Sequence, residues 1–349
     1  IRDFCLSRGL GDVYKRQRAD RLKRLINQAP LDAKESLKER LVDKLEYQEN
    51  MLAALEKEYS AQRIDWLDYF YSLKPSPKTA PVVAVLAVSG EIADGPSVLS
   101  SFKGDAVAGA DTFISQLKEI AEIENLRALV VRIDSPGGSY TAADTMRQAL
   151  ADFKAEKQIP VIVSMSSYAA SGGYFIALPA DKIIADGASL TGSIGVLGGK
   201  PVLSGLWKKL DIVWDGVSFG ENAGILSLNH PFSAAEKEVF NKSLDNVYED
   251  FVSKTAKARN ISLKKMDELA RGRIWTGEQA LENRLIDELG GYNEAVAAAK
   301  ALAGLETDAA FRTVFYPRPK TMQEKIAELM SAAPFAAANR LKMQIGLDN

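Results

Sequence analysis

Short apolar runs alternate with amphipathic stretches along the middle of the chain. Val-rich and Ile-rich runs predict buried strands at residues 82–88, 128–133, 160–165 and 183–185. Apolar positions at helical spacing predict helices at 112–123, 142–154, 172–178, 206–210, 233–258 and 293–302. Because the strands show no period-two alternation and helices separate them, we expect an α/β fold with a mostly parallel sheet.

The two ends of this region show different patterns. Residues 18–61 are charged and carry leucines at helical spacing, which predicts helices in a bundle or an extended packing arm. The Pro-rich run at 74–78 predicts a linker and a domain boundary. Toward the other end, residues 311–316 predict a strand and residues 322–330 a helix.

The first 17 residues have no Met, no signal-peptide pattern and no periodicity. Residues 12–17 resemble the translation of a sequencing adapter, so we expect this segment, with Cys5, not to belong to the protein by descent. A short disordered leader is the alternative. We therefore expect a non-native leader at 1–17, a helical segment and linker at 18–78, a main domain at 79–305 and a strand/helix tail at 306–349.

Composition narrows the function. The 349 residues are 46% hydrophobic and 26% charged, and the net charge of −2 argues against nucleic acid or an anionic membrane surface as a partner. One cysteine and one histidine exclude a disulfide framework and argue against a zinc site, so we expect no metal and no other cofactor. The longest apolar run, 82–88, is too short for the roughly 20 residues of a membrane-spanning helix.

Three glycine-rich turns follow the predicted strands: Asp-Ser-Pro-Gly-Gly-Ser at 134–139, Ala-Ala-Ser-Gly-Gly-Tyr at 169–174 and Thr-Gly-Ser-Ile-Gly at 191–195. The carboxyl ends of parallel strands lie at one edge of a sheet, so the turns can meet. Ser171 would sit at the positive end of a helix, beside the N–H of Gly172. Glycine N–H groups with no side chain over them can stabilise an oxyanion.

Each turn also has an ordinary structural explanation. Ser-Pro-Gly-Gly forms plain turns, Ala-Ala-Ser-Gly-Gly allows close helix packing, and Thr-Gly-Ser often caps a helix. The order and spacing of all three are more specific than any one of them. We therefore interpret Ser171 as the nucleophile of a serine hydrolase that works without histidine.

The general base is harder to find. The single histidine, His230, stands in a loop before a helix with no positioning signal, and we interpret it as a surface or capping residue. The usual substitute is a lysine made neutral by burial. Lys200, Lys208 and Lys209 follow the third turn, but the last two fit a solvated helix face, and no lysine stands out.

The three turns, together with Trp-Thr-Gly-Glu-Gln-Ala at 275–280, closely resemble the signal peptide peptidase A (protease IV) family over about residues 81–305. The resemblance implies a ClpP/crotonase-like spiral of β-β-α units and a membrane-associated serine protease that degrades cleaved signal peptides. By position, Ser171 matches the nucleophile, Gly138 and Gly172 the backbone donors of the oxyanion hole, and Ser193 the serine that positions the lysine.

The sequence departs from the short form of that family. The short form has its lysine downstream of the nucleophile in a Ser-Gly-Lys run, whereas this chain has Phe-Gly-Glu-Asn-Ala-Gly at 219–224. The long form consists of two homologous halves, with the lysine in the first and the serine in the second. The resemblance thus implies a C-terminal half whose base lies outside this chain, with the helices before Pro75 ending the first half. By itself, this chain is expected to be nearly inactive.

The resemblance also implies a homo-oligomer at the inner membrane, facing the periplasm, with its anchor in the missing N-terminal part and peptides as substrates. Two alternatives remain open from the residues alone. A crotonase-like acyl-CoA enzyme would use an acidic residue and give Ser171 no role. In a non-catalytic scaffold, the glycine turns would only build an oligomer.

Overall fold

The computed structural model describes residues 19–28, 30–65, 69, 77, 79–99, 106–306 and 310–318. The leader at 1–17 and the helix predicted at 322–330 lie outside this part. The chain divides into two compact units, Ile1–Pro75 and Ser76–Asn349, and this division falls within the predicted linker at 74–78.

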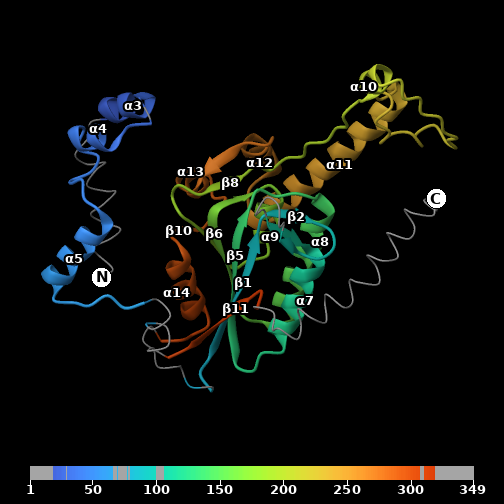
Figure 1. Cartoon of the computed structure of the whole chain (residues 1–349). Helices are drawn as coiled ribbons and strands as arrows, with labels where there is room; N and C mark the ends of the chain where they lie inside the picture. The colour runs from blue at the N-terminus through green and yellow to red at the C-terminus, as the bar shows by residue number, and fades with distance from the viewer. Residues whose placement is uncertain are drawn as a thin grey trace, which may run out of the picture. The chain divides into compact units, whose positions relative to one another are not determined.

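The described residues of the first unit form helices in the region where the leucine pattern predicts them: α3 (Ala19–Gln28), α4 (Ala33–Lys38) and α5 (Gln48–Tyr59) (Figure 1). Asp32 caps α4 by accepting a hydrogen bond from the N–H of Glu35 at 2.7 Å, and the Glu35 side chain bonds back to the N–H of Asp32. This reciprocal pair satisfies two N–H groups that a helix start leaves unbonded.

The second unit is built on a parallel sheet with the strand order β10-β7-β6-β5-β1-β11. Its strands are β1 (Val82–Ser89), β5 (Leu126–Ser135), β6 (Val161–Ala170), β7 (Lys182–Ala185), β10 (Glu288–Leu289) and β11 (Arg312–Tyr316). Every neighbouring pair along this order is parallel. The predicted α/β class with a parallel sheet is confirmed.

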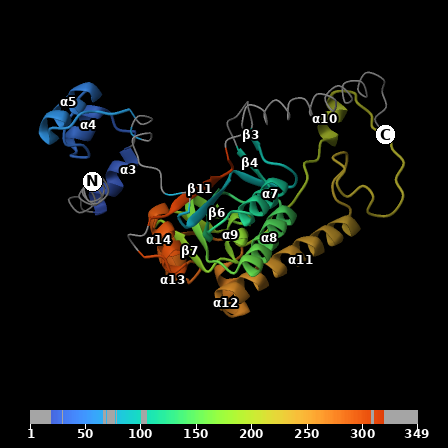
Figure 2. The same cartoon turned by 90° about the horizontal axis from the view of Figure 1, so that it is seen from below.

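Helices cover both faces of the sheet (Figures 1 and 2). Leu86 and Val131 pack on one face with residues of α7 (Ala110–Ala121), α8 (Tyr140–Lys157), α9 (Gly172–Ala177) and the second half of α11 (Ala234–Arg259). Val83 and Val130 pack on the other face with α14 (Tyr292–Leu302). Burial on both faces explains why the strand sequences show no alternation.

Further short strands that the apolar pattern did not predict lie outside this strand order. They are β2 (Glu91–Ala93), β3 (Val98–Leu99), β4 (Ala106–Gly109), β8 (Leu190–Gly192) and β9 (Ile274–Thr276). The first three form a small sheet of their own, whereas β8 pairs with the end of β6 and with β9.

These short strands take part in a repeated unit, in which a strand of the large sheet continues into a short extended segment that precedes a helix. Strand β1 continues into β2, and α7 follows after β3 and β4. Strand β5 is followed by Gly138, which bridges to Ile92, and then by α8, and the two halves of β6 precede α9. The repeat is the β-β-α arrangement that the resemblance implies.

Two boundary details affect the site. Strand β6 continues past its predicted end at Met165 as far as Ala170, so Ser171 follows the strand directly. Helix α11 begins with the predicted capping box, in which the Glu236 N–H donates to Ser233 Oγ at 3.1 Å and the Ser233 N–H donates to Glu236 Oε2 at 2.8 Å.

The remaining helices are α10 (Ser204–Lys209), α12 (Leu263–Leu269) and α13 (Gly277–Glu282). In the described part of the chain, every helix is too short or too polar to cross a lipid bilayer.

Candidate active site

Ser171 lies at the junction of β6 and α9, with φ of 52° and ψ of −119°. A positive φ is uncommon for a residue other than glycine and is often found where function requires it. The Ser171 N–H donates to the carbonyl of Gly192 at 2.9 Å, and the Ser171 carbonyl accepts from the N–H of Phe175 at 2.9 Å. The backbone is therefore held on both sides, while the hydroxyl makes no capping bond to α9.

The loop at 136–139 lies against Ser171. Gly137 and Gly138 have φ of 104° and 152°, and the Ile92 N–H donates to Gly137 O while the Ser139 N–H donates to Ile92 O, both at 2.8 Å. A Cβ on Gly137 would come within 2.8 Å of Ser171 Cβ, and one on Gly138 within 2.0 Å of Ile92 O. Only glycine fits these positions.

Two N–H groups flank this contact. Gly172 is the first residue of α9, where a helix leaves its N–H groups unbonded. A Cβ on Gly137 would also lie 2.8 Å from the nitrogen of Gly172. Among the described residues, the N–H groups of Gly138 and Gly172 donate to no protein acceptor. They are therefore free to bind an oxygen that reacts at Ser171.

Ser193 follows β8 in the same way that Ser171 follows β6. Its φ is 49°, its N–H donates to Arg273 O at 2.7 Å, and it is half-buried. It does not line the pocket beside Ser171, although Gly195 does. The fold therefore brings Ser171, Gly138, Gly172 and Ser193 to one edge of the sheet.

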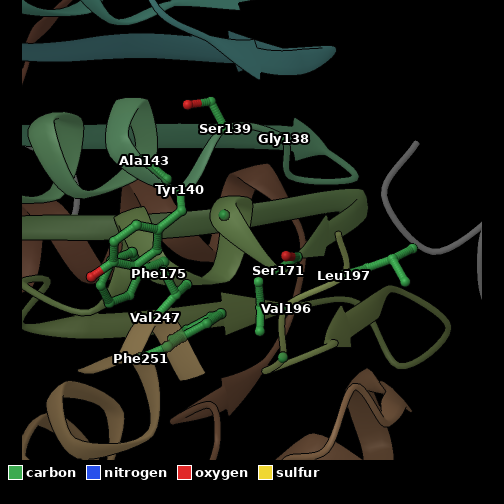
Figure 3. Close-up of a pocket in the computed structure, with 12 residues that line it drawn as sticks. Gly138, Ser139, Tyr140, Ala143, Ser171, Phe175, Val196, Leu197, Val247 and Phe251 are labelled. Carbon is green, nitrogen blue, oxygen red and sulfur yellow. The ribbon is translucent and has the colours of Figure 1, made fainter. Parts of the chain in front are cut away.

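A pocket of about 340 Å³ opens beside Ser171 (Figure 3). Tyr140 and Ala143 of α8 and Phe175 of α9 line it, together with Val247 and Phe251 of α11. No pattern in the sequence predicts that α11 lies at this pocket. The i, i+4 spacing of its two pocket residues was the available signal, but such spacing marks a buried helix face without saying what it faces.

The aromatic side chains that form one wall of the pocket pack against one another. The Phe175 ring centroid lies 5.7 Å from that of Tyr140 and 4.6 Å from that of Phe251. The Tyr140 hydroxyl donates to Asp250. Burial and the nearby Asp250 carboxylate raise the pKa of Tyr140 above its ordinary value, so this hydroxyl stays neutral.

The histidine and the lysines considered as general bases do not line the pocket beside Ser171. His230 is half exposed, with Nδ1 2.8 Å from Pro231 O and 3.9 Å from Glu236 Oε2, a position near the start of α11. Lys208 and Lys209 lie in the last turn of α10, and Lys200 Nζ lies 4.5 Å from the ring centroid of Phe232. The described residues that line the pocket include neither lysine nor histidine. The described chain also contains no metal-binding group of three or more His, Cys, Asp or Glu side chains.

Comparison with known proteins finds peptidases that are similar to this chain. Residues 152–306 match the profile of peptidase family S49. The chain is 33% identical over 306 residues to Protease 4 of Salmonella typhi, covering 86% of this chain and 48% of that protein. It is 30% identical over 344 residues to the chloroplastic serine protease SPPA of Arabidopsis thaliana, covering 96% and 50%. A candidate protease of Synechocystis sp. is 34% identical over 217 residues, covering 62% and 78%.

These matches place the chain in the class of serine-type peptidases. More particularly, the chain belongs to peptidase family S49. It spans about half the length of the Salmonella and Arabidopsis relatives. Among solved structures, a ClpP1 mutant of Listeria monocytogenes matches with a TM-score of 0.40 at 16% identity, covering 61% of this chain and 94% of that one. The fold assignment rests on the strand order described above.

Proposed function

We propose that this chain carries the nucleophile and the oxyanion hole of a Ser/Lys endopeptidase. Ser171 is the nucleophile, the N–H groups of Gly138 and Gly172 form the oxyanion hole, and Ser193 positions the lysine. One observation carries the proposal: Ser171 is held at positive φ beside two free N–H groups and a pocket. Membership in peptidase family S49 supports it.

The chemistry follows from these positions. Ser171 Oγ attacks the carbonyl carbon of the peptide bond as its proton passes to a neutral lysine amine. The carbonyl oxygen gains negative charge and accepts hydrogen bonds from Gly138 and Gly172, an interaction whose loss costs about 3–4 kcal/mol in known hydrolases. The lysine ammonium then protonates the leaving amine. Water, deprotonated by the same lysine, then attacks the acyl carbon, the bond to Ser171 Oγ breaks, and the lysine ammonium returns the proton to Oγ.

The lysine lies, in this proposal, outside the described residues. Lys254, near the pocket wall, forms ion pairs with Asp144 and Asp250 and does not line the pocket. The Salmonella and Arabidopsis relatives are about twice as long as the aligned part, which supports a base from another half of the whole protein. Residues 79–305 are then the peptidase domain, 18–78 the end of the first half, and 306–349 a tail.

The pocket supports a peptide with apolar side chains as substrate. A cavity of about 150 Å³ already holds benzene, and the pocket beside Ser171 measures about 340 Å³ with an aromatic wall. Signal peptides have an apolar core, so we propose them as substrates of the whole protein.

We further propose a homo-oligomer at the inner membrane, facing the periplasm and anchored by a part outside the described residues. Leu197, Val213, Val217 and Phe219 are at least 90% exposed, and in this proposal another chain covers them.

The test uses the whole protein and two serine substitutions. Ser171→Ala should abolish peptide hydrolysis and labelling by a fluorophosphonate. Ser115→Ala is the matched control, because Ser115 lies on α7, where its hydroxyl bonds to the Thr112 carbonyl. Hydrolysis that persists in Ser171→Ala would refute the assignment. Efficient turnover by the isolated chain would place the base within it.

A further inference from the structure

We propose that Lys254 is a positioning residue that sets the width of the pocket beside Ser171, and thereby the side chain accepted next to the cleaved bond. The proposal concerns how two helices are held together behind the pocket. It rests on the proposed function for the identity of its substrate. The tests below include one that does not depend on turnover.

Lys254 joins α11 to α8. Its ammonium lies 2.9 Å from Asp144 Oδ1 on α8 and 2.7 Å from Asp250 Oδ2 on α11. Arg147 of α8 donates to the same Asp144 oxygen at 2.8 Å. We call Asp144, Arg147, Asp250 and Lys254 the clamp. Through it, the two helices are tied by charged groups at one point.

The clamp lies directly behind the pocket wall. Lys254 Nζ is 5.5 Å and Arg147 Cζ 5.4 Å from the ring centroid of Phe175, which is fully buried and lines the pocket. Cations at these distances are attracted to an aromatic ring. The clamp therefore fixes the Phe175 ring as well as the two helices.

Tyr140 links the clamp to the pocket a second time. Its ring lines the pocket and stacks on Phe175, while its hydroxyl donates to Asp250 and points away from Ser171 (Figure 3). One side of this residue thus faces the substrate space and the other side is held by the clamp. A shift of Asp250 would move the wall.

The clamp is better suited to positioning than to stability. The side chains of Lys254, Asp144 and Asp250 are 31%, 34% and 36% exposed, and ion pairs this open to water add little to folding. The pocket, however, takes Ala143 from α8 and both Val247 and Phe251 from α11. The spacing of the two helices therefore decides its width.

The first test compares peptides with phenylalanine and with alanine next to the cleaved bond, using the whole protein. We expect Lys254→Met to lower kcat/KM for the phenylalanine peptide, relative to kcat/KM for the alanine peptide, about tenfold. The main cause should be a higher KM for the phenylalanine peptide. Lys254→Arg, which keeps the charge, should retain the ratio. Lys257→Met, exposed one turn away on α11, is the control. An unchanged ratio in Lys254→Met would overturn the proposal.

The second test measures binding of N-acetylphenylalaninamide by NMR to this chain carrying Ser171→Ala. Lys254→Met should weaken the Kd severalfold, and an unchanged Kd would overturn the proposal whether or not Ser171 is the nucleophile. If Lys254→Met unfolds the chain, Asp144→Asn loosens the same clamp with an isosteric side chain. Failure of the proposed function would instead appear as hydrolysis independent of Ser171.

Discussion

Ser171 and Ser193 occupy equivalent positions at the ends of two paired strands. Ala170 of β6 and Gly192 of β8 are paired in the parallel register. Ser171 directly follows Ala170, and Ser193 directly follows Gly192. Their φ values are 52° and 49°, and the Ser171 N–H donates to the Gly192 carbonyl at 2.9 Å. The backbones of the two serines therefore lie next to each other at this edge of the sheet.

Ser193→Ala should lower kcat about 10- to 100-fold in the whole protein, with little change in KM. A hydrogen bond to a charged group contributes about 1.5–3 kcal/mol, and each 1.4 kcal/mol is tenfold in rate. Steady-state kinetics would check this, with Ser115→Ala as the control on α7. A variant as active as the wild type would show that Ser193 does not position the base.

Gly138→Ala should remove most of the activity and also destabilise the fold. The new Cβ would lie 2.0 Å from Ile92 O at a φ of 152°, so the loop must move and take its N–H with it. Loss of one oxyanion donor lowers kcat by about 10²–10³-fold. Gly205→Ala, where a Cβ meets nothing within 4 Å, is the control. Full activity in Gly138→Ala would exclude this N–H from the oxyanion hole.

Asp144 should make the fold sensitive to acid. Burial would raise the pKa of Asp144, but hydrogen bonds from Lys254 and Arg147 outweigh burial and hold the pKa below its ordinary value. The stabilisation is therefore present above about pH 4 and is lost as the pH falls through the folded-state pKa.

The size of this effect is small because the carboxylate is partly exposed. Asp144→Asn should lower the free energy of unfolding at pH 7 by less than about 1 kcal/mol and flatten its decline below pH 4. Urea unfolding at several pH values would measure both changes. An equally steep decline in the variant would show that Asp144 is not responsible.

Tyr174→Phe should cost about 1–2 kcal/mol of stability. The Tyr174 hydroxyl is fully buried and donates to Leu285 O at 2.8 Å, so the substitution leaves a buried carbonyl without its partner. Thermal unfolding would measure the loss. A stability equal to that of the wild type would mean that the carbonyl finds another donor.

The same tyrosine should weaken the fold in alkali. Burial raises the pKa of Tyr174 above its ordinary value of about 10, so the unfolded state loses its proton first. Stability is full below about pH 10 and falls as the pH rises toward the folded-state pKa, by up to about 1.4 kcal/mol per pH unit. Tyr174→Phe should show a shallower fall above pH 10, and parallel curves would contradict this.

The parts of the fold that depend on local pattern could be predicted from the sequence. Strand β1 is an apolar run up to Val88 and β5 contains the apolar run 128–131, while Ser233 and Glu236 form the capping box at the start of α11, so each is encoded by neighbouring residues. Gly137 and Gly138 mark a turn because no other residue tolerates those φ values. The order and spacing of the three glycine turns predict Ser171 as the nucleophile.

The short strands could not be predicted in this way. Strands β2 and β8 have only three residues each, too few for a period to appear, and they form because distant segments offer hydrogen bonds. The alignment of Ser171 with Ser193 depends on one such pairing. Register of this kind is a property of two segments together.

By itself, the sequence determined the α/β class and the glycine turns, because apolar periodicity and glycine act through adjacent residues. Only the tertiary structure decided that Val247 and Phe251 of α11 line the pocket beside Ser171, with Lys254 behind its wall near Phe175. The physical reason is that packing selects which face of a helix meets which pocket, and the helix sequence alone leaves that partner open.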